Sequence, residues 1–363
     1  MIARMRDDII DPSLVKRALI IKLRHHGDVL LTGPVFTALK RNIPHAEIDG
    51  LVYLDTADML SGHPDVTELF TVDRAWKKLG LSGHLRGEWG LLKALRARQY
   101  DLIVHLTEHA RGAMLVHLLQ PRYSVSGAYT HKRGRLWRGT FTHVYASPLT
   151  PRHAIERNLD AVRRLGIYPT PKDRPLTLVP GAAAEQRVAA MLHAHGLSAR
   201  RFIQVHPASR WNYKAWTVSG FAELIDNLQA RGERVVITSA PDRRELNLVQ
   251  QILTRLQRPP VNLAGSLSLK ELAALIGRAR CLIGVDSVPM HIAAAMGTPV
   301  VALFGPSGDI EWQPWRVPHR IVTADFPCRP CGLEGCGNSY HSDCLAAISA
   351  AQVLAAVDEL LAA

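Results

Sequence analysis

The sequence predicts an α/β protein built from two doubly wound domains, each with a parallel sheet covered by helices. Short apolar runs alternate with helical patterns along most of the chain. A segment with four prolines, residues 166–180, separates two such alternating halves and is typical of a linker. Residues 281–308 have the pattern of a strand, a turn, a helix and a second strand, which is a parallel βαβ unit.

The first half begins with the apolar run 18–23, which lies between basic residues and is typical of a buried parallel strand. A helix is expected to start at Asp28 and Val29, directly after that strand. The patterns that follow predict strands at 48–53, 69–72 and 102–106 and helices at 28–41, 55–61, 89–98, 110–119 and 153–165.

The second half repeats the alternation and ends in an amphipathic pattern. It predicts strands at 202–205, 235–238, 261–263, 282–285 and 300–304 and helices at 218–230, 245–256, 269–279 and 350–362. Because ligands bind at the carboxyl ends of parallel strands, we expect a reaction site in a cleft between the two domains. This pattern would equally fit other two-domain α/β proteins, including binding proteins of the periplasmic type.

Composition limits the classes of protein to consider. The chain has 363 residues, 47% hydrophobic and 21% charged, and no apolar run approaches the roughly 20 residues that cross a bilayer. The first residues have no apolar core of a secretory signal, so we expect a cytoplasmic protein, which argues against the periplasmic type.

The charge favours an anionic partner. The net charge is +12 and the pI is about 9.8, without a zinc-finger, homeodomain or RNA-binding signature. We therefore expect the membrane surface and a phosphate-bearing acceptor as partners, and no nucleic acid. The alternative is an ordinary soluble protein that happens to be basic.

The turn at 286–291 predicts an anion site. Asp286 and Ser287 follow the apolar strand, Val288 and Pro289 begin the helix, and His291 lies in its first turns. Free backbone N–H groups at a helix start suit a diphosphate, to which Ser287, Val288 and His291 would contribute. The turn lacks the spaced glycines of the dinucleotide fingerprint and the GK[ST] of a P-loop. Asp286, being acidic, is expected to orient backbone amides or contact sugar hydroxyls, and a buried structural histidine is the alternative for His291.

Three motifs resemble a known family. IIKLRHHGDVLLTGPVFTALK (20–40), HPASRWNYKAW (206–216) and GVDSVPMHIAAAMGTPVVALFGPS (284–307) resemble the first strand and loop, the second-domain loop and the donor motif of the lipopolysaccharide core heptosyltransferases of glycosyltransferase family nine. The motifs have the family's order and spacing. The resemblance implies the GT-B architecture, with an acceptor-binding domain at 1–170, an ADP-heptose-binding domain at 171–345 and a C-terminal helix at 346–363.

The resemblance also implies roles for individual residues. Asp28 would be the general base of a single displacement with inversion, although Asp also favours helix starts for structural reasons. Lys214 would offset charge on the leaving diphosphate, with Ser209 as a phosphate-binding hydroxyl; their alternatives are a solvated lysine and a turn residue. Either Asp242 or Glu245 would accept from the ribose hydroxyls, or stabilise a helix start instead.

The chain has no D-x-D motif, so we expect no cofactor and no catalytic metal. The rival class is a non-catalytic protein that binds nucleotide sugars or phosphoglycans on the same scaffold. The presence of both Asp28 and Lys214 argues against it, since a binding protein needs no base.

Two further features have no assigned chemistry. The spacing of Cys328, Cys331, Cys336 and Cys344 leaves a structural zinc site or free thiols as alternatives.

The other feature is a basic, aromatic segment, expected to contact acceptor phosphates or the inner face of the cytoplasmic membrane, with Trp137 at headgroup level. Its residues are His131, Lys132, Arg133, Arg135, Trp137 and Arg138. The alternative is a solvated loop with Trp137 packed into its own domain.

Overall fold

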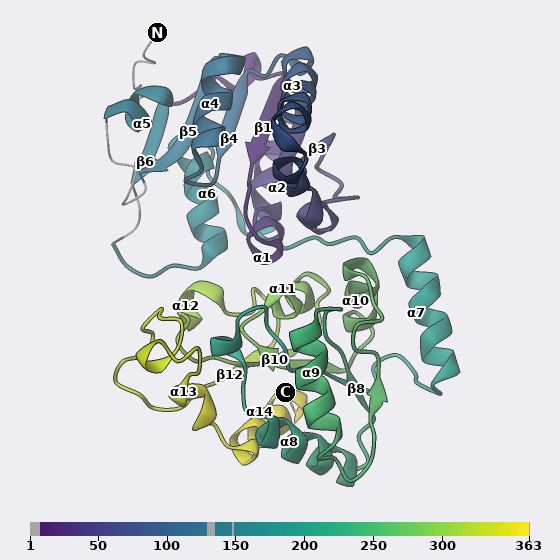
Figure 1. Cartoon of the computed structure of the whole chain (residues 1–363). Helices are drawn as coiled ribbons and strands as arrows, with labels where there is room; N and C mark the ends of the chain where they lie inside the picture. The colour runs from purple at the N-terminus through teal and green to yellow at the C-terminus, as the bar shows by residue number, and fades with distance from the viewer. Residues whose placement is uncertain (1–7, 129–134, 147–148, 363) are drawn as a thin grey trace. The chain divides into compact units, whose positions relative to one another are not determined.

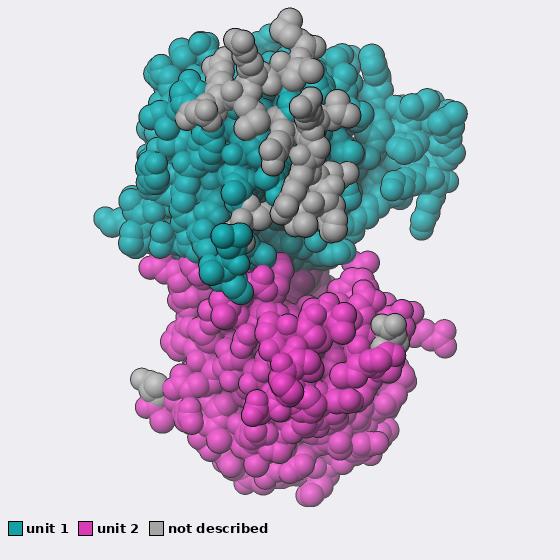
Figure 2. Space-filling view, turned by 90° about the vertical axis from the view of Figure 1, so that its left-hand side faces the viewer, with its two compact units in different colours: residues 1–179 teal, residues 180–363 magenta. Residues whose placement is uncertain are grey.

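The computed structural model describes residues 8–128, 135–146 and 149–362 (Figure 1). The chain divides into two compact units, residues 1–179 and residues 180–363, shown in teal and magenta in Figure 2. The division follows Val179, later than the expected boundary at residue 170. The C-terminal helix packs into the second unit and does not form a part of its own.

The first unit contains a parallel six-stranded sheet with the strand order β3-β2-β1-β4-β5-β6. Its strands are β1 (Arg17–Ile21), β2 (Glu47–Tyr53), β3 (Leu69–Val72), β4 (Leu102–His105), β5 (Tyr123–Ala128) and β6 (His143–Ala146). Its α-helices are α1 (His26–Leu30), α2 (Gly33–Asn42), α3 (Gly80–Arg98), α4 (Ala110–Leu119), α5 (Arg135–Thr140) and α6 (Ala154–Arg164). Its 3-10 helices are η1 (Pro12–Leu14), η2 (Leu54–Met59), η3 (Arg74–Lys78) and η4 (Pro171–Asp173).

The second unit repeats this plan with the order β12-β11-β10-β7-β8-β9. Its strands are β7 (Ile203–His206), β8 (Val235–Ile237), β9 (Val261–Asn262), β10 (Cys281–Val285), β11 (Val300–Leu303) and β12 (His319–Val322). Its α-helices are α7 (Ala182–Ala194), α8 (Val218–Ala230), α9 (Arg243–Leu253), α10 (Leu269–Ile276), α11 (Val288–Ala295), α12 (Asp309–Trp312), α13 (Asp343–Ala346) and α14 (Ala350–Ala362). Its 3-10 helices are η5 (Asn212–Lys214) and η6 (Cys336–Asn338).

Both sheets have the doubly wound order, in which the chain builds the sheet outward in one direction from its first strand and then in the other. The reversal lies between β1 and β4 in one unit and between β7 and β10 in the other. A crevice for ligands forms at the carboxyl ends of the strands at such a point. The prediction of two parallel α/β sheets is therefore confirmed, and the topology marks where each unit should bind a ligand.

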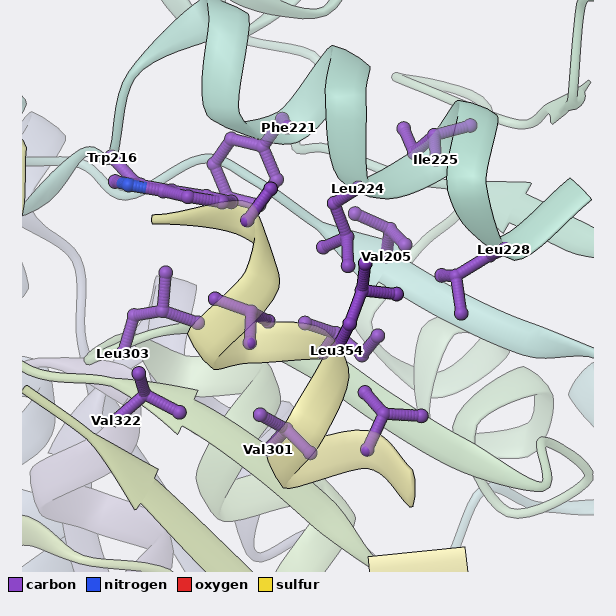
Figure 3. Close-up of a cluster of buried hydrophobic side chains, with 14 of the residues drawn as sticks. Val205, Trp216, Phe221, Leu224, Ile225, Leu228, Val301, Leu303, Val322 and Leu354 are labelled. Carbon is purple, nitrogen blue, oxygen red and sulfur yellow. The ribbon is translucent and has the colours of Figure 1, made fainter. Parts of the chain in front are cut away.

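Each sheet has its own core. In the first unit, side chains of α3, α4 and α5 pack on Ile21 and Ile103. In the second, Phe221 and Leu224 of α8 and Leu354 of α14 pack on the strands β7, β11 and β12 (Figure 3). Trp216 joins this cluster, and its indole N–H donates to the Ile348 carbonyl at 3.0 Å.

Several expected elements differ from those found. The helix expected from Asp28 to residue 41 is two helices, because Pro34 has no N–H for the backbone bond to the fourth preceding residue. α3 begins at Gly80, nine residues before the expected helix at 89–98. The elements β5, β6, α7 and β12 were not expected. β5 and β6 contain Ser, Gly and His, and α7 is rich in alanine, so their apolar periodicity is weak.

Candidate active-site residues of the two units

Asp28 lies in the helix that follows β1, the strand beside the switch point of the first sheet. This carboxylate lies in the first turn of α1, where it is half-buried and favourably placed in the helix dipole. The helix begins at His26, so Asp28 is not the N-cap residue that its position after the strand suggested. Its environment includes one residue that the sequence analysis did not single out, Lys22.

Lys22 follows β1 directly, and its side chain is buried, with 8% of its surface exposed. Its ammonium donates to the Leu106 carbonyl at 3.1 Å and to Oδ1 of Asn158 at 3.2 Å. Asn158 in turn donates to the Leu31 carbonyl at 3.0 Å. Burial lowers the pKa of Lys22 to about 8, while the charge of Asp28 acts in the opposite direction. A polar residue ending an apolar run is the signal that could have identified Lys22.

The last residue of β4, His105, is a second buried polar side chain close to Lys22. His105 is fully buried, and burial lowers the pKa of its imidazole to about 3, so the ring is neutral. Nδ1 of His105 lies 3.3 Å from the Ser126 hydroxyl, and Nε2 lies 3.0 Å from that of Thr107. The carboxyl ends of β1, β4 and β5 therefore carry the buried polar side chains of Lys22, His105 and Ser126.

The crevice of the second unit brings together two residues far apart in the sequence. Nζ of Lys214, at the end of η5, donates to Oδ2 of Asp286 at 2.6 Å. Asp286 follows β10 and is almost fully buried. The loop after β7 and the turn after β10 thus meet at the topological switch point. The side-chain contact found for Asp286 is the one with Lys214, while its expected action on backbone amides or sugar hydroxyls stays a prediction.

The turn after Asp286 has the expected form. Ser287 is the extended N-cap residue of α11, and Pro289 lies in the first turn, where it needs no N–H donor. His291 is buried, and its ring lies 6.4 Å from that of Trp312. Val288 is the first residue of this eight-residue helix, so its backbone N–H lies at the helix N-terminus.

A pocket of about 350 Å³ lies beside the same loop. It is lined by three of the predicted donor-binding residues, Ser209, Asp242 and Glu245. Ala208, Arg210, Asn212 and Ala215 of the same loop also line it. Arg244 lines the pocket as well and was not predicted; it is the next residue but one after Asp242 in the same helix turn.

The two pocket carboxylates differ in their partners. Asp242 is the N-cap residue of α9 and accepts from the Arg244 N–H at 2.8 Å. Oε2 of Glu245 accepts from the Ala240 N–H at 2.9 Å, and burial raises its pKa. Both carboxylates therefore accept a backbone N–H at the start of α9, as expected of acidic residues at a helix start.

The expected role of Trp137 in membrane contact is wrong for this structure. Its side chain is 8% exposed, its indole N–H donates to the Gly127 carbonyl at 3.2 Å, and its ring centroid lies 5.2 Å from that of Phe141. The ring packs in the core of the first unit and cannot lie at headgroup level. Of the other residues in that segment, Arg135 and Arg138 lie in α5, while His131, Lys132 and Arg133 lie outside the described residues.

None of the five cysteines, all of which the structure describes, forms a disulfide. Within the described residues, no group of three or more His, Cys, Asp or Glu side chains is placed to hold a metal ion. Cys344 is buried, which raises the pKa of its thiol, whereas Cys328 and Cys336 are exposed and Cys331 is half-buried. The choice between a structural zinc site and free thiols stays a prediction.

Comparison with known proteins places the chain in a family. A family model described as glycosyltransferase family 9 (heptosyltransferase) matches residues 89–340. Lipopolysaccharide heptosyltransferase 3 of Escherichia coli is 39% identical over 93% of this chain and 97% of its own length. Lipopolysaccharide heptosyltransferase 2 of Escherichia coli K12 is 26% identical over 84% and 87%.

The fold agrees with that of a solved structure. The structure of the Escherichia coli ADP-heptose lipopolysaccharide heptosyltransferase II has a TM-score of 0.75 to this chain, with 23% identity over 95% of this chain and 98% of that one. The expected GT-B architecture is confirmed. None of the helices in the described part of the chain is long and apolar enough to cross a membrane.

Proposed function

Because the chain belongs to glycosyltransferase family 9, the heptosyltransferases, we propose that it transfers L-glycero-D-manno-heptose from ADP-heptose to an inner-core heptose of lipopolysaccharide. Within the family, heptosyltransferase III is the member we propose. The support is the difference between 39% identity to an E. coli heptosyltransferase 3 and 26% to heptosyltransferase 2.

We propose that residues 180–363 bind the donor. The observation that carries this assignment is the contact between Lys214 and Asp286, beside a pocket lined by Ser209 and Glu245. ADP-heptose needs a cation near its diphosphate and acceptors near its ribose, and these residues supply both. Lys214 would offset the negative charge that grows on the departing ADP, with no metal ion required for that step.

Residues up to 179 would bind the acceptor and carry the base. In a single displacement, the acceptor hydroxyl oxygen forms a bond to the anomeric carbon while the bond from that carbon to the β-phosphate oxygen breaks. Asp28 would receive the hydroxyl proton, and ADP would leave with the bonding electrons. One carboxylate suffices for this route, which inverts the anomeric centre. The acceptor is anchored in lipid, so we also propose that the protein works at the inner face of the cytoplasmic membrane as a peripheral protein.

One experiment tests the proposal directly. The protein is incubated with ADP-heptose and core-truncated lipopolysaccharide, ADP release is measured, and the product is analysed by mass spectrometry and NMR. We expect ADP release that depends on the acceptor, a heptose attached as a branch on an inner-core heptose, and an inverted anomeric configuration. Attachment at the position that extends the main chain would indicate heptosyltransferase II. ADP-heptose binding without transfer would indicate a non-catalytic binding protein.

A further inference from the structure

An exposed apolar stripe runs along α3 in the first unit. Leu81, Leu85 and Trp89 follow one another at intervals of four residues, so they lie on one side of the helix. Their exposed fractions are 78%, 59% and 66%. Met114 and Leu118 of α4, also four residues apart, are exposed as well. Single exposed apolar residues are ordinary, but a contiguous group of them marks an interaction surface.

The two helices form a shallow groove at this stripe. Residues of both line a depression of about 130 Å³, among them Leu85, Trp89, Met114 and Leu118. Its apolar residues continue inward to Leu91, Leu95 and Leu115 in the core, so the base of the groove is held by the sheet. The surface is therefore a fixed feature of the fold.

The surroundings of the stripe are strongly basic. Residues 74–98 contain seven Lys or Arg residues and one acid, Glu88. That acid is paired with Arg111 of α4. The exposed cations next to the stripe are Lys77, Lys78, Arg86, Lys93 and Arg96.

This combination fits a lipid surface better than a protein partner. Protein interfaces are depleted in lysine, whereas an amphipathic helix that lies in a membrane interface has Leu and Trp on one face and Lys and Arg around it. Trp89 has the ring that is enriched at headgroup level, and long lysine side chains extend toward lipid phosphates. The net positive charge complements an anionic leaflet.

We infer that the α3–α4 face, defined by Leu81, Leu85, Trp89, Met114 and Leu118 with its basic rim, docks the protein onto an anionic phospholipid bilayer. This inference rests on the proposed function, which requires a lipid-anchored acceptor. It places the contact on a surface other than the segment around Trp137. The apolar side chains enter the interface while the lysines and arginines lie on the phosphates.

Sedimentation with phosphatidylglycerol vesicles tests the docking face. The triple variant Leu81→Ser, Leu85→Ser, Trp89→Ser keeps every charge, and we expect it to lose vesicle partitioning by at least about tenfold. A rim variant, Lys77→Glu, Lys78→Glu, Lys93→Glu, should lose binding most strongly at low salt. The matched control, Leu54→Ser, Leu149→Ser, Tyr168→Ser, removes three other exposed apolar groups of the same unit and should bind as the wild type does.

Trp89 gives a second readout. Vesicles should shift the tryptophan emission of the wild type to the blue, and Trp89→Phe should abolish most of that shift while the variant still binds. Circular dichroism and thermal melting of each variant verify folding. Phosphatidylcholine vesicles should bind the wild type weakly.

Three outcomes would overturn the inference. The first is a folded stripe variant that sediments with phosphatidylglycerol vesicles like the wild type. The second is a change of oligomeric state in light scattering with unchanged vesicle binding, which would assign the stripe to a second copy of the chain. The third is a loss of binding in the control variant equal to that of the stripe variant.

Turnover of a deacylated acceptor without vesicles should be equal in the stripe variant and the wild type. Failure of the wild type in that assay would refute the proposed function instead.

Discussion

Lys214 and Asp286 form an ion pair at the proposed donor site, and the two residues should respond differently to substitution. Lys214→Ala removes the cation, so we expect weaker ADP-heptose binding and a kcat reduced by about 10²–10³-fold. Asp286→Asn keeps the Lys214 cation but removes the carboxylate that orients it. We therefore expect ADP affinity near that of the wild type and slower transfer. Calorimetry measures the ADP affinity of each variant, and steady-state kinetics measure its transfer rate. Wild-type affinity and turnover in Lys214→Ala would mean that Lys214 is an ordinary surface lysine.

Asp28 is the proposed base, and its removal should affect chemistry more than binding. Asp28→Asn keeps the size of the side chain and its place in α1 but cannot accept the proton. We expect kcat to fall by at least about 10²-fold with ADP-heptose affinity nearly unchanged. Single-turnover kinetics with the donor in excess separates the two. Asp55→Asn is a suitable control, since that carboxylate pairs with Arg74; near-normal turnover in Asp28→Asn would reject the assignment.

Lys22 should make folding stability depend on pH in the alkaline range. Its pKa is lowered from the ordinary value of 10.5 to about 8 in the folded chain. Between these values the unfolded chain binds a proton that the folded chain has lost, so stability rises with pH over this window. The full shift corresponds to a gain of roughly 3–3.5 kcal/mol. Urea unfolding of the wild type and Lys22→Met from pH 7.5 to 10.5 should show this rise only in the wild type. Lys16→Met, which removes an exposed lysine, is the control and should retain the rise in stability with pH. Parallel curves of unfolding free energy against pH for the wild type and Lys22→Met would contradict the prediction.

At the scale of elements, Gly112 fixes how α4 packs on β4. A Cβ atom at Gly112 would lie 2.0 Å from Nε2 of His105, which is fully buried and bonded to Thr107 and Ser126. Gly112→Ala should therefore destabilise the first unit by about 1–3 kcal/mol. Gly90→Ala on α3 is the control, because nothing lies within 4 Å of its added Cβ. That change should stabilise the helix by up to about 1 kcal/mol. Thermal melting compares the two, and equal effects would show that the contact with His105 is not rigid.

The sequence predicted elements best where periodicity and end signals agree. The strand β10, the helix α11 and the strand β11 are strongly apolar and bounded by Asp286, Gly297 and Gly305, so their positions were predicted closely. The helix α8 and the helix α14 match the predicted 218–230 and 350–362. Local signals failed where one residue overrides a pattern, as Pro34 does between α1 and α2. They also failed for short strands such as β6, which are set by pairing with distant residues.

The candidate site was predictable in composition but not in its contacts. Asp286 follows a strand end, and Asp28 and Lys214 lie in the segments after β1 and β7, which a sequence reveals. The ion pair joins residues 72 positions apart, and only the fold brings them together. Trp137 shows the opposite error, since a basic neighbourhood suggested exposure while the ring packs in the core against both His105 and Phe141.

At the scale of the whole molecule, each unit has its own sheet and its own core, and the residues proposed for the donor all lie in residues 180–363. We therefore expect this fragment, expressed alone, to fold and to bind ADP. Its Kd should be within about tenfold of that of the full chain, a difference of roughly 1.4 kcal/mol. The fragment of residues 1–179 should not bind ADP, and Lys214→Ala in the 180–363 fragment should weaken binding as in the full chain. Calorimetry, with circular dichroism to verify folding, measures this. A folded 180–363 fragment without ADP affinity would mean that the donor site needs residues from both units.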